Sequence, residues 1–235
     1  GQRIRPLFFV AFVPAAISVS LIFLVRERPH PRLRGRAAEP FSLSGLPGRY
    51  WRVIAVLGTF ALVNFSDTLL LLRADDLGFG VTSVILVYVL YNATYAALSL
   101  PAGIVSDRMP RRVVVGVGLL LFAATYLGLG LTSSPAAIWA LFAVYGGYAA
   151  LTDGVSRAWV ADLVPRSEVG TALGVQSGVT GIGAFAASLW AGLAWGHDGR
   201  VPLVVAGAVV AVLAAVLLAA GSRLDPTPVA DPEPS

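Results

Sequence analysis

Apolar runs of about 20 residues recur along most of this chain, with short polar stretches between them. The hydrocarbon core of a bilayer is about 30 Å thick, so a helix that spans it needs about 20 mostly apolar residues. The runs lie at 7–25, 50–72, 81–105, 113–131, 136–156, 171–195 and 201–220. The pattern therefore predicts an all-α integral membrane protein with about seven transmembrane helices.

Composition excludes several other classes of protein. Hydrophobic residues make up 57% of the chain and charged residues 13%, whereas a soluble domain carries roughly a quarter charged residues. The chain has no cysteine, which excludes disulfides and thiolate chemistry, and no lysine, which excludes a retinal-type Schiff base. The arginines lie in short stretches between apolar runs and form no single basic patch, so we expect no nucleic-acid binding.

The sequence shows no arrangement of residues that is typical of a catalytic or metal-binding site. The only histidines, His30 and His197, fall in loops on opposite sides of the predicted membrane. No nucleophile with a nearby base is visible in the sequence. We therefore expect neither an enzyme nor a bound metal or cofactor.

The two ends of the chain differ from its middle. It begins with Gly1 and enters the 7–25 run almost at once, which predicts that further sequence lies upstream. A signal peptide is the alternative, but no small-residue cleavage pattern follows the run, which is long for such a segment. Residues 26–49 are rich in arginine and proline and predict a loop, and residues 222–235 predict a disordered tail.

Arginines are distributed unequally between the two sides of the predicted membrane. When the spans alternate in direction, thirteen arginines fall on one side and four, Arg3, Arg5, Arg73 and Arg200, on the other. Loops rich in arginine and lysine stay in the cytoplasm. We therefore expect the arginine-rich side, the 26–49 loop and the C-terminus to be cytoplasmic.

The most specific local pattern is the turn at residues 103–112, Gly-Ile-Val-Ser-Asp-Arg-Met-Pro-Arg-Arg. It places one carboxylate and three guanidinium groups between two spans: Asp107, Arg108, Arg111 and Arg112. Gly103 lets a neighbouring helix approach closely, and Arg111 can bridge to an acid on another span. A basic loop that only fixes orientation is the alternative.

This turn resembles the loop signature of the major facilitator superfamily (MFS), Gly-x-Leu-Ala/Ser-Asp-Arg-x-Gly-Arg-Arg, in its second copy. Val105 replaces the usual leucine and Pro110 the second glycine. Residues 153–165 resemble the tenth helix of the same superfamily and the loop after it, although Val169 stands where an arginine is usual.

Asp153 and Arg157 in this second match are spaced by four residues, so they lie on one helix face and can pair. The resemblance implies that Asp153 also meets the arginines of the 103–112 turn. Asp107, Arg111 and Asp153 would then form a gating cluster that latches one state of a transporter.

The resemblance covers nearly the whole chain and implies a C-terminal MFS half. Residues 1–25 would correspond to helix six, and residues 50–221 to the six-helix bundle of helices seven to twelve. The substrate site would lie at the midplane, between this half and an N-terminal half supplied upstream in the same chain or by a second subunit.

Asp67 is the most informative residue inside a predicted span. A carboxylate at the centre of a membrane helix costs about 2.5–3.5 kcal/mol on insertion scales and is usually retained for function. Asn64 lies on the same helix face, and residues 64–67 resemble the seventh helix of facilitator-type exporters, where this face looks into the substrate cavity. The alternatives for Asp67 are a structural hydrogen bond to Asn92 or Tyr95, or a hydrated position near the membrane surface.

Tyrosines and an asparagine form a stripe on the next span, at helical spacing. The stripe consists of Tyr88, Tyr91, Asn92 and Tyr95, and Tyr145 and Tyr148 on a later span extend it. Such a stripe suits either a cavity wall or a seam between helices. Glycines at 170, 174, 178 and 181 predict a close-packing face on the span at 171–195.

Taken together, these features predict a secondary active transporter in a cell membrane, and we expect that membrane to be a bacterial inner membrane. It would export an unidentified small molecule by alternating access, with Asp67 loading and releasing a proton. The alternative is a membrane subunit or scaffold that does not transport.

Overall fold

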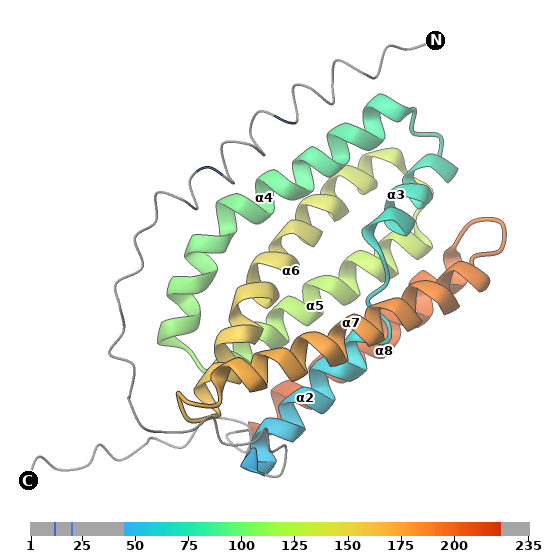
Figure 1. Ribbon diagram of the computed structural model, residues 1–235. Helices are drawn as coiled ribbons and strands as arrows, with labels where there is room; N and C mark the ends of the chain where they lie inside the picture. Colours follow the sequence, from blue (N-terminus) through green and yellow to red (C-terminus); the bar gives the residue numbers. More distant parts are fainter. Residues whose placement is uncertain (1–11, 13–19, 21–44, 222–235) are drawn as a thin grey trace, which may run out of the picture. The chain divides into compact units, whose positions relative to one another are not determined.

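The computed structural model describes residues 12, 20 and 45–221, and residues 45–221 contain seven helices. Their bounds are α2 Gly48–Ala61, α3 Asp67–Asp76, α4 Val81–Arg108, α5 Arg111–Leu131, α6 Pro135–Asp162, α7 Val169–Leu193 and α8 Arg200–Ala219 (Figure 1). The predicted 7–25 span, most of the 26–49 loop and the 222–235 tail lie outside the described residues.

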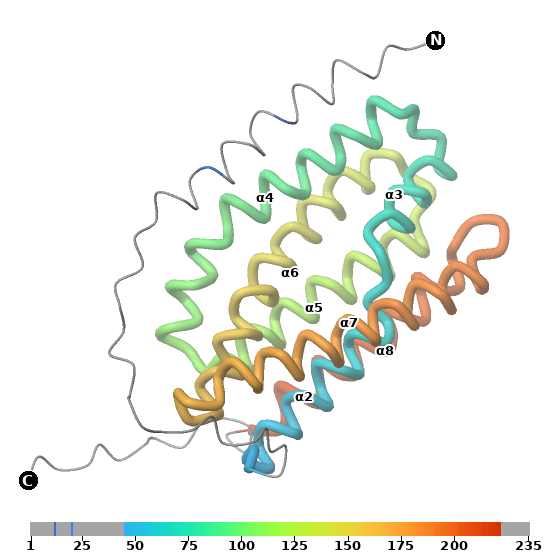
Figure 2. Tube along the Cα trace, in the orientation of Figure 1, coloured from blue at the N-terminus to red at the C-terminus, as the bar shows by residue number. Residues whose placement is uncertain are grey.

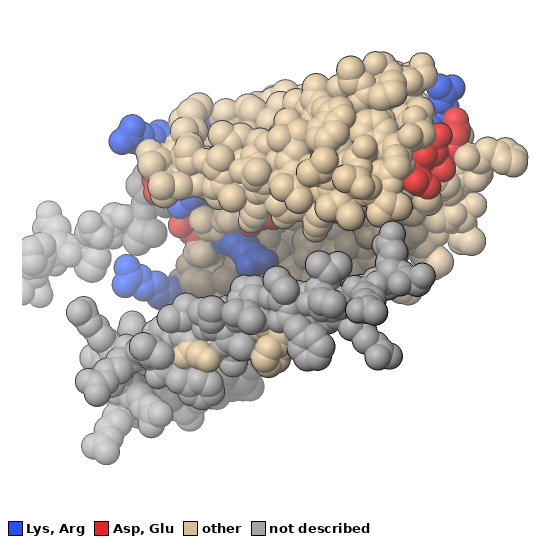
Figure 3. Space-filling view, turned by 90° about the horizontal axis from the view of Figure 1, so that it is seen from above, with Lys and Arg blue, Asp and Glu red and all other residues tan. Residues whose placement is uncertain are grey.

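Five of the helices in the described part of the chain, α4 to α8, are long and apolar enough to cross a membrane. They have 20 to 28 residues each and coincide with the predicted spans from residue 81 onward. The face seen in Figure 3 is mostly uncharged, and its charged side chains gather toward the two ends. The prediction of an all-α integral membrane protein is confirmed.

The predicted span at 50–72 is two short helices rather than one. α2 ends at Ala61, α3 begins at Asp67, and the chain between them is not helical, as the trace in Figure 2 shows. The Ser66 side chain caps α3 by accepting a hydrogen bond from the backbone N–H of Thr68 at 3.3 Å. The expectation of one helix was wrong because the apolar residues on both sides of the break together make one run long enough to span a membrane.

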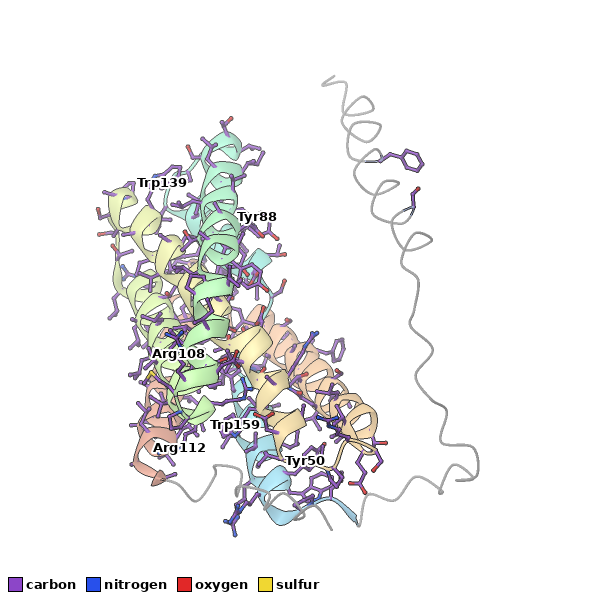
Figure 4. The ribbon with its side chains drawn as sticks, turned by 90° about the vertical axis from the view of Figure 1, so that its left-hand side faces the viewer. Tyr50, Tyr88, Arg108, Arg112, Trp139 and Trp159 are labelled. Atoms are coloured by element: carbon purple, nitrogen blue, oxygen red, sulfur yellow. The ribbon has the colours of Figure 1, made fainter. Side chains whose placement is uncertain are left out.

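Neighbouring helices pack in a defined order. α5 packs most extensively against α8 and α6, α6 also packs along α4, and α2 packs against α7 (Figure 1). We call the end of the bundle with the α4–α5 turn the Asp107 end, and the end where α3 finishes the Arg73 end. In Figure 4, Arg112 and Tyr50 lie toward the first of these, and Tyr88 and Trp139 toward the second.

Arg73 fixes α3 to the rest of the bundle. Its side chain is 2% exposed. The guanidinium group donates hydrogen bonds to the carbonyl oxygens of Leu129 at 3.1 Å, Thr132 at 3.2 Å and Asp198 at 2.9 Å. Leu129 and Thr132 lie at the C-terminus of α5, where carbonyls lack helical partners and favour a positive charge. Arg73 therefore ties the short α3 to the end of α5 and to the α7–α8 loop.

The close helix contacts at glycines are not at the positions that the sequence predicts. A Cβ on Gly146 of α6 would lie 2.6 Å from the Tyr91 carbonyl oxygen and 2.8 Å from the Thr94 Cβ on α4. On α7, a Cβ would meet no described atom within 4 Å at any of the four predicted positions, Gly170, Gly174, Gly178 and Gly181. The predicted close-packing face of α7 is therefore wrong for the described bundle, because α7 turns these glycines away from it.

We predict that Gly146→Ala destabilises the protein by about 1–3 kcal/mol, because the new methyl group must push against the α4 backbone. Gly147→Ala is a matched control, since its Cβ would come no closer than 3.4 Å to the Leu121 side chain. Thermal unfolding of the purified protein in detergent measures both variants. Equal melting temperatures for Gly146→Ala and the unsubstituted protein would contradict the α4–α6 contact.

Candidate functional site

The break between α2 and α3 is held by side chains of other helices. Trp190 on α7 donates from Nε1 to the Leu62 carbonyl oxygen at 2.8 Å. Ser188, also on α7, accepts from the Ser66 backbone N–H at 3.1 Å. Irregular backbone at membrane depth is tolerated when neighbouring helices satisfy its polar groups. The break is therefore a supported feature of the fold, and it presents Asp67 at the first turn of α3.

Two hydrogen bonds connect this break to α6. The Tyr145 hydroxyl donates to Asp67 Oδ1 at 2.7 Å, and Asn64 Nδ2 donates to the Tyr148 hydroxyl oxygen at 3.2 Å. The partner of Asp67 is therefore Tyr145, and the alternative of a bond to Asn92 or Tyr95 is wrong. The amide of Asn92 donates to a carbonyl of its own helix, and Asn92 is exposed.

Aromatic rings surround Asp67. The rings of Tyr91 and Tyr145 lie 5.1 Å apart, as do those of Tyr145 and Tyr148, and Phe122 packs edge-on against Tyr148 at 5.0 Å. Such separations are usual for interacting aromatic pairs. α4, α5 and α6 thus contribute one continuous aromatic wall beside the break.

Two adjoining cavities open on this wall. One, of about 490 Å³, lies between α2, α5, α6 and α7, and the other, of about 530 Å³, lies beside the break and reaches α4. They share four lining residues, Asn64, Tyr148, Asp153 and Ala184. Volumes of about 300–1,000 Å³ are typical of small-molecule sites.

Most of the residues predicted for a cavity do line these two. Five of the eight are there: Asn64, Asp67, Tyr91, Tyr145 and Tyr148. Tyr95 lines a third cavity of about 320 Å³ between α4 and α6. Tyr88 and Asn92 are exposed on α4 and line none of the three.

Arg111 connects three helices at the Asp107 end. Its Nε bonds to Asp162 at the end of α6, one terminal nitrogen donates to Ser106 Oγ at 3.2 Å, and the other lies 3.6 Å from Asp107. Arg108 is exposed, and a Cβ on Gly103 would meet no described atom within 4 Å. The 103–112 turn is thus linked through Arg111 to both α4 and α6.

Asp153 does not join this cluster as expected. It precedes Asp162 by nine residues, which is about 13 Å along a helix, and the acid that reaches Arg111 is Asp162. Asp153 instead lies at the junction of the two larger cavities, where Arg157 and Asp67 are close enough to influence it electrostatically. The expected Asp107–Arg111–Asp153 cluster is therefore corrected to Asp107, Arg111 and Asp162.

Gln176 on α7 is a cavity residue that the sequence reading missed. It lines the 490 Å³ cavity and is 6% exposed, and its Oε1 has no hydrogen-bond partner among the described residues. A buried amide oxygen without a partner is uncommon in proteins. The available signal was one amide within an apolar span.

A bundle of membrane helices with a broken helix beside a polar cavity is an arrangement found in secondary transporters. The family model described as Major Facilitator Superfamily matches residues 53–235. This chain belongs to the major facilitator superfamily. It is a multi-pass membrane protein of that family, and the family comprises transporters rather than enzymes.

Two curated relatives are similar to this chain. An uncharacterized MFS-type transporter of Methanocaldococcus jannaschii is 30% identical over 218 residues, which cover 90% of this chain and 54% of that protein. The tetracenomycin C resistance and export protein of Streptomyces glaucescens is 27% identical over 175 residues, which cover 72% of this chain and 32% of that protein. The chain thus spans about half the length of the first relative and a third of the second.

Proposed function

We propose that this chain is the C-terminal half of a proton-coupled MFS exporter of a small molecule. The observation that carries the proposal is the position of Asp67, a carboxylate at a helix break that lines a cavity of about 530 Å³. Ionisable groups at membrane depth that face a cavity typically serve ion or substrate pathways. The export function of the Streptomyces glaucescens relative adds support for the outward direction.

In this proposal the arginine-rich side faces the cytoplasm, as the distribution of arginines favours. Residues 1–25 act as helix six, residues 26–49 as a cytoplasmic loop, residues 50–221 as helices seven to twelve and residues 222–235 as a cytoplasmic tail. The N-terminal half, from the same chain upstream or from a second subunit, closes the other side of the cavity.

The contacts of Arg111 give the proposed transporter a latch at the Asp107 end. They connect the end of α4, the start of α5 and the end of α6, so they persist only while these three helix ends stay together. Interactions of this kind favour one of two states of a rocking transporter. Gly103, Arg108 and Arg112 belong to the same turn, whereas Asp153 and Arg157 line the 490 Å³ cavity.

The function is tested with the full-length protein in liposomes that contain a pH-sensitive dye. A library of compounds is added, and a proton-coupled exporter moves protons across the membrane in response to its substrates. A folded protein that moves no protons with any compound would favour the scaffold alternative.

We expect Arg111→Ala to slow transport of a compound found in this way by about tenfold or more, while its binding affinity changes little, because Arg111 lines neither of the two larger cavities. Initial rates in liposomes and equilibrium binding in detergent separate the two effects. Arg108→Ala, in the same turn, is the control and should transport at a rate close to that of the unsubstituted protein. An unchanged rate for Arg111→Ala would contradict the latch.

A further inference from the structure

Negatively charged side chains outnumber positively charged ones in the two larger cavities. Asp67 and Asp153 contribute two carboxylates, and Arg157 is the one cationic side chain among the lining residues of both cavities. Arg157 lies one turn from Asp153 on the same helix, so its charge offsets part of the charge of Asp153. Asp67 has no ion pair with a described cationic side chain, and its hydrogen bond comes from the neutral Tyr145.

The surroundings of Asp67 fit a particular kind of counter-ion. The 530 Å³ cavity places Asp67 together with the aromatic side chains of Tyr91, Tyr148 and Phe185. Aromatic ring faces attract cations, and the attraction grows when water is excluded. A small inorganic cation would leave these rings without contacts, whereas an organic cation with an apolar or aromatic body uses both the rings and the carboxylate.

The adjoining 490 Å³ cavity supplies hydrogen-bonding groups, and the one acid that lines it, Asp153, shares it with Arg157. Gln176, Thr180 and Ser177 on α7 line it, and the Gln176 amide oxygen lacks a partner within the described chain. Rotation of the amide about its last side-chain torsion presents either its oxygen or its N–H groups to a ligand. This cavity therefore suits the neutral polar part of a ligand.

From this arrangement we infer that the substrate is an organic monocation of drug size, whose charged nitrogen pairs with Asp67 and whose aromatic part lies against Tyr91 and Tyr148. Its neutral polar groups extend toward Gln176. Proton and substrate then compete for one carboxylate, so that only one of them is bound at a time. The inference rests on the proposed function and adds the class of substrate.

Doxorubicin and N-acetyldoxorubicin form a matched pair of fluorescent probes, because acetylation removes the positive charge of the amine and leaves the ring system unchanged. Binding to the full-length protein in detergent is measured by fluorescence polarisation, with protein-free micelles as the blank. We expect doxorubicin to bind about tenfold more tightly than the acetylated compound. Asp67→Asn should remove this preference, and Asp75→Asn, on the same helix outside the cavities, should keep it.

Three results would overturn the inference: equal binding of the two probes, a preference that survives in Asp67→Asn, or binding of neither probe. Tyr91→Leu adds a test of the aromatic part, since it should weaken doxorubicin binding and leave the preference for the charged probe. The transporter proposal itself can be tested without any ligand, by asking whether the cavity is accessible to a labelling reagent from each side of the membrane. If that accessibility holds while the charge preference is absent, the transporter proposal stands and only the substrate class is wrong.

Discussion

Asp67→Asn is expected to abolish proton-driven transport, whereas downhill exchange of the substrate should continue at substrate concentrations high enough to offset its weaker binding. Asparagine keeps the shape of the side chain, and its oxygen can still accept the hydrogen bond from Tyr145. It cannot take up or release a proton at neutral pH. Coupling should therefore be lost without loss of the fold.

The measurement compares two assays in liposomes that contain the full-length protein. In one, a pH gradient drives accumulation of the substrate against its own gradient, and in the other labelled and unlabelled substrate exchange without a pH gradient. Asp75→Asn is the control, because Asp75 is exposed on the same helix and lines neither large cavity. Accumulation by Asp67→Asn at the unsubstituted rate would show that another group carries the proton.

The second large effect concerns stability. Arg73→Met should destabilise the protein by about 3–5 kcal/mol, because it removes a buried charge and leaves three carbonyl oxygens, those of Leu129, Thr132 and Asp198, without their donor. The α3 helix has only ten residues and depends on this attachment at its end. Unfolding of the purified protein in detergent, followed by heat or denaturant, measures the loss.

Arg200→Met provides a control, because Arg200 also contacts Asp198, but through the exposed carboxylate. Arg200 lies 3.2 Å from Asp198, but its side chain is 52% exposed, and surface ion pairs contribute only about 0–1 kcal/mol. A small effect at Arg200 and a large one at Arg73 is the expected contrast. Similar effects at both positions would contradict the view that Arg73 acts through buried carbonyls.

The long helices were predictable from the sequence because each is one continuous apolar run with polar ends. The break between α2 and α3 was not, because the groups that support it come from far along the chain. Ser188 and Trp190 lie 122 and 128 residues from their partners. The residues at the break carried one local signal, since Ser66 followed by Asp67 is a common start of a helix.

The cavity residues were predictable to the extent that polar groups inside an apolar span are costly and face inward. That argument identified Asp67, and Asn64 followed because it lies on the same helix face. It could not choose Tyr145 as the partner of Asp67, because the choice depends on how α3 and α6 pack. Arg73 was assigned to a loop for a similar reason. Its burial depends on the end of α5 and on the α7–α8 loop, which no local pattern at residue 73 reveals.

Accessibility of a single cysteine in the cavity tests the central claim most directly. The 235 residues contain no cysteine, so Ser177→Cys, which lines the 490 Å³ cavity, can be labelled specifically once cysteines elsewhere in the full-length protein are replaced. A membrane-impermeant maleimide is added to right-side-out and to inside-out vesicles. Val212→Cys on α8, which is 65% exposed and lines neither large cavity, is the control and should not be labelled in either case.

If the protein works by alternating access, Ser177→Cys is labelled in both kinds of vesicle, because the cavity opens in turn to each side of the membrane. Replacing Arg111 by alanine in the same protein should change the ratio of the two labelling rates, since the latch favours one state. Labelling from one side only, whatever the pH and with or without the latch, would contradict the account.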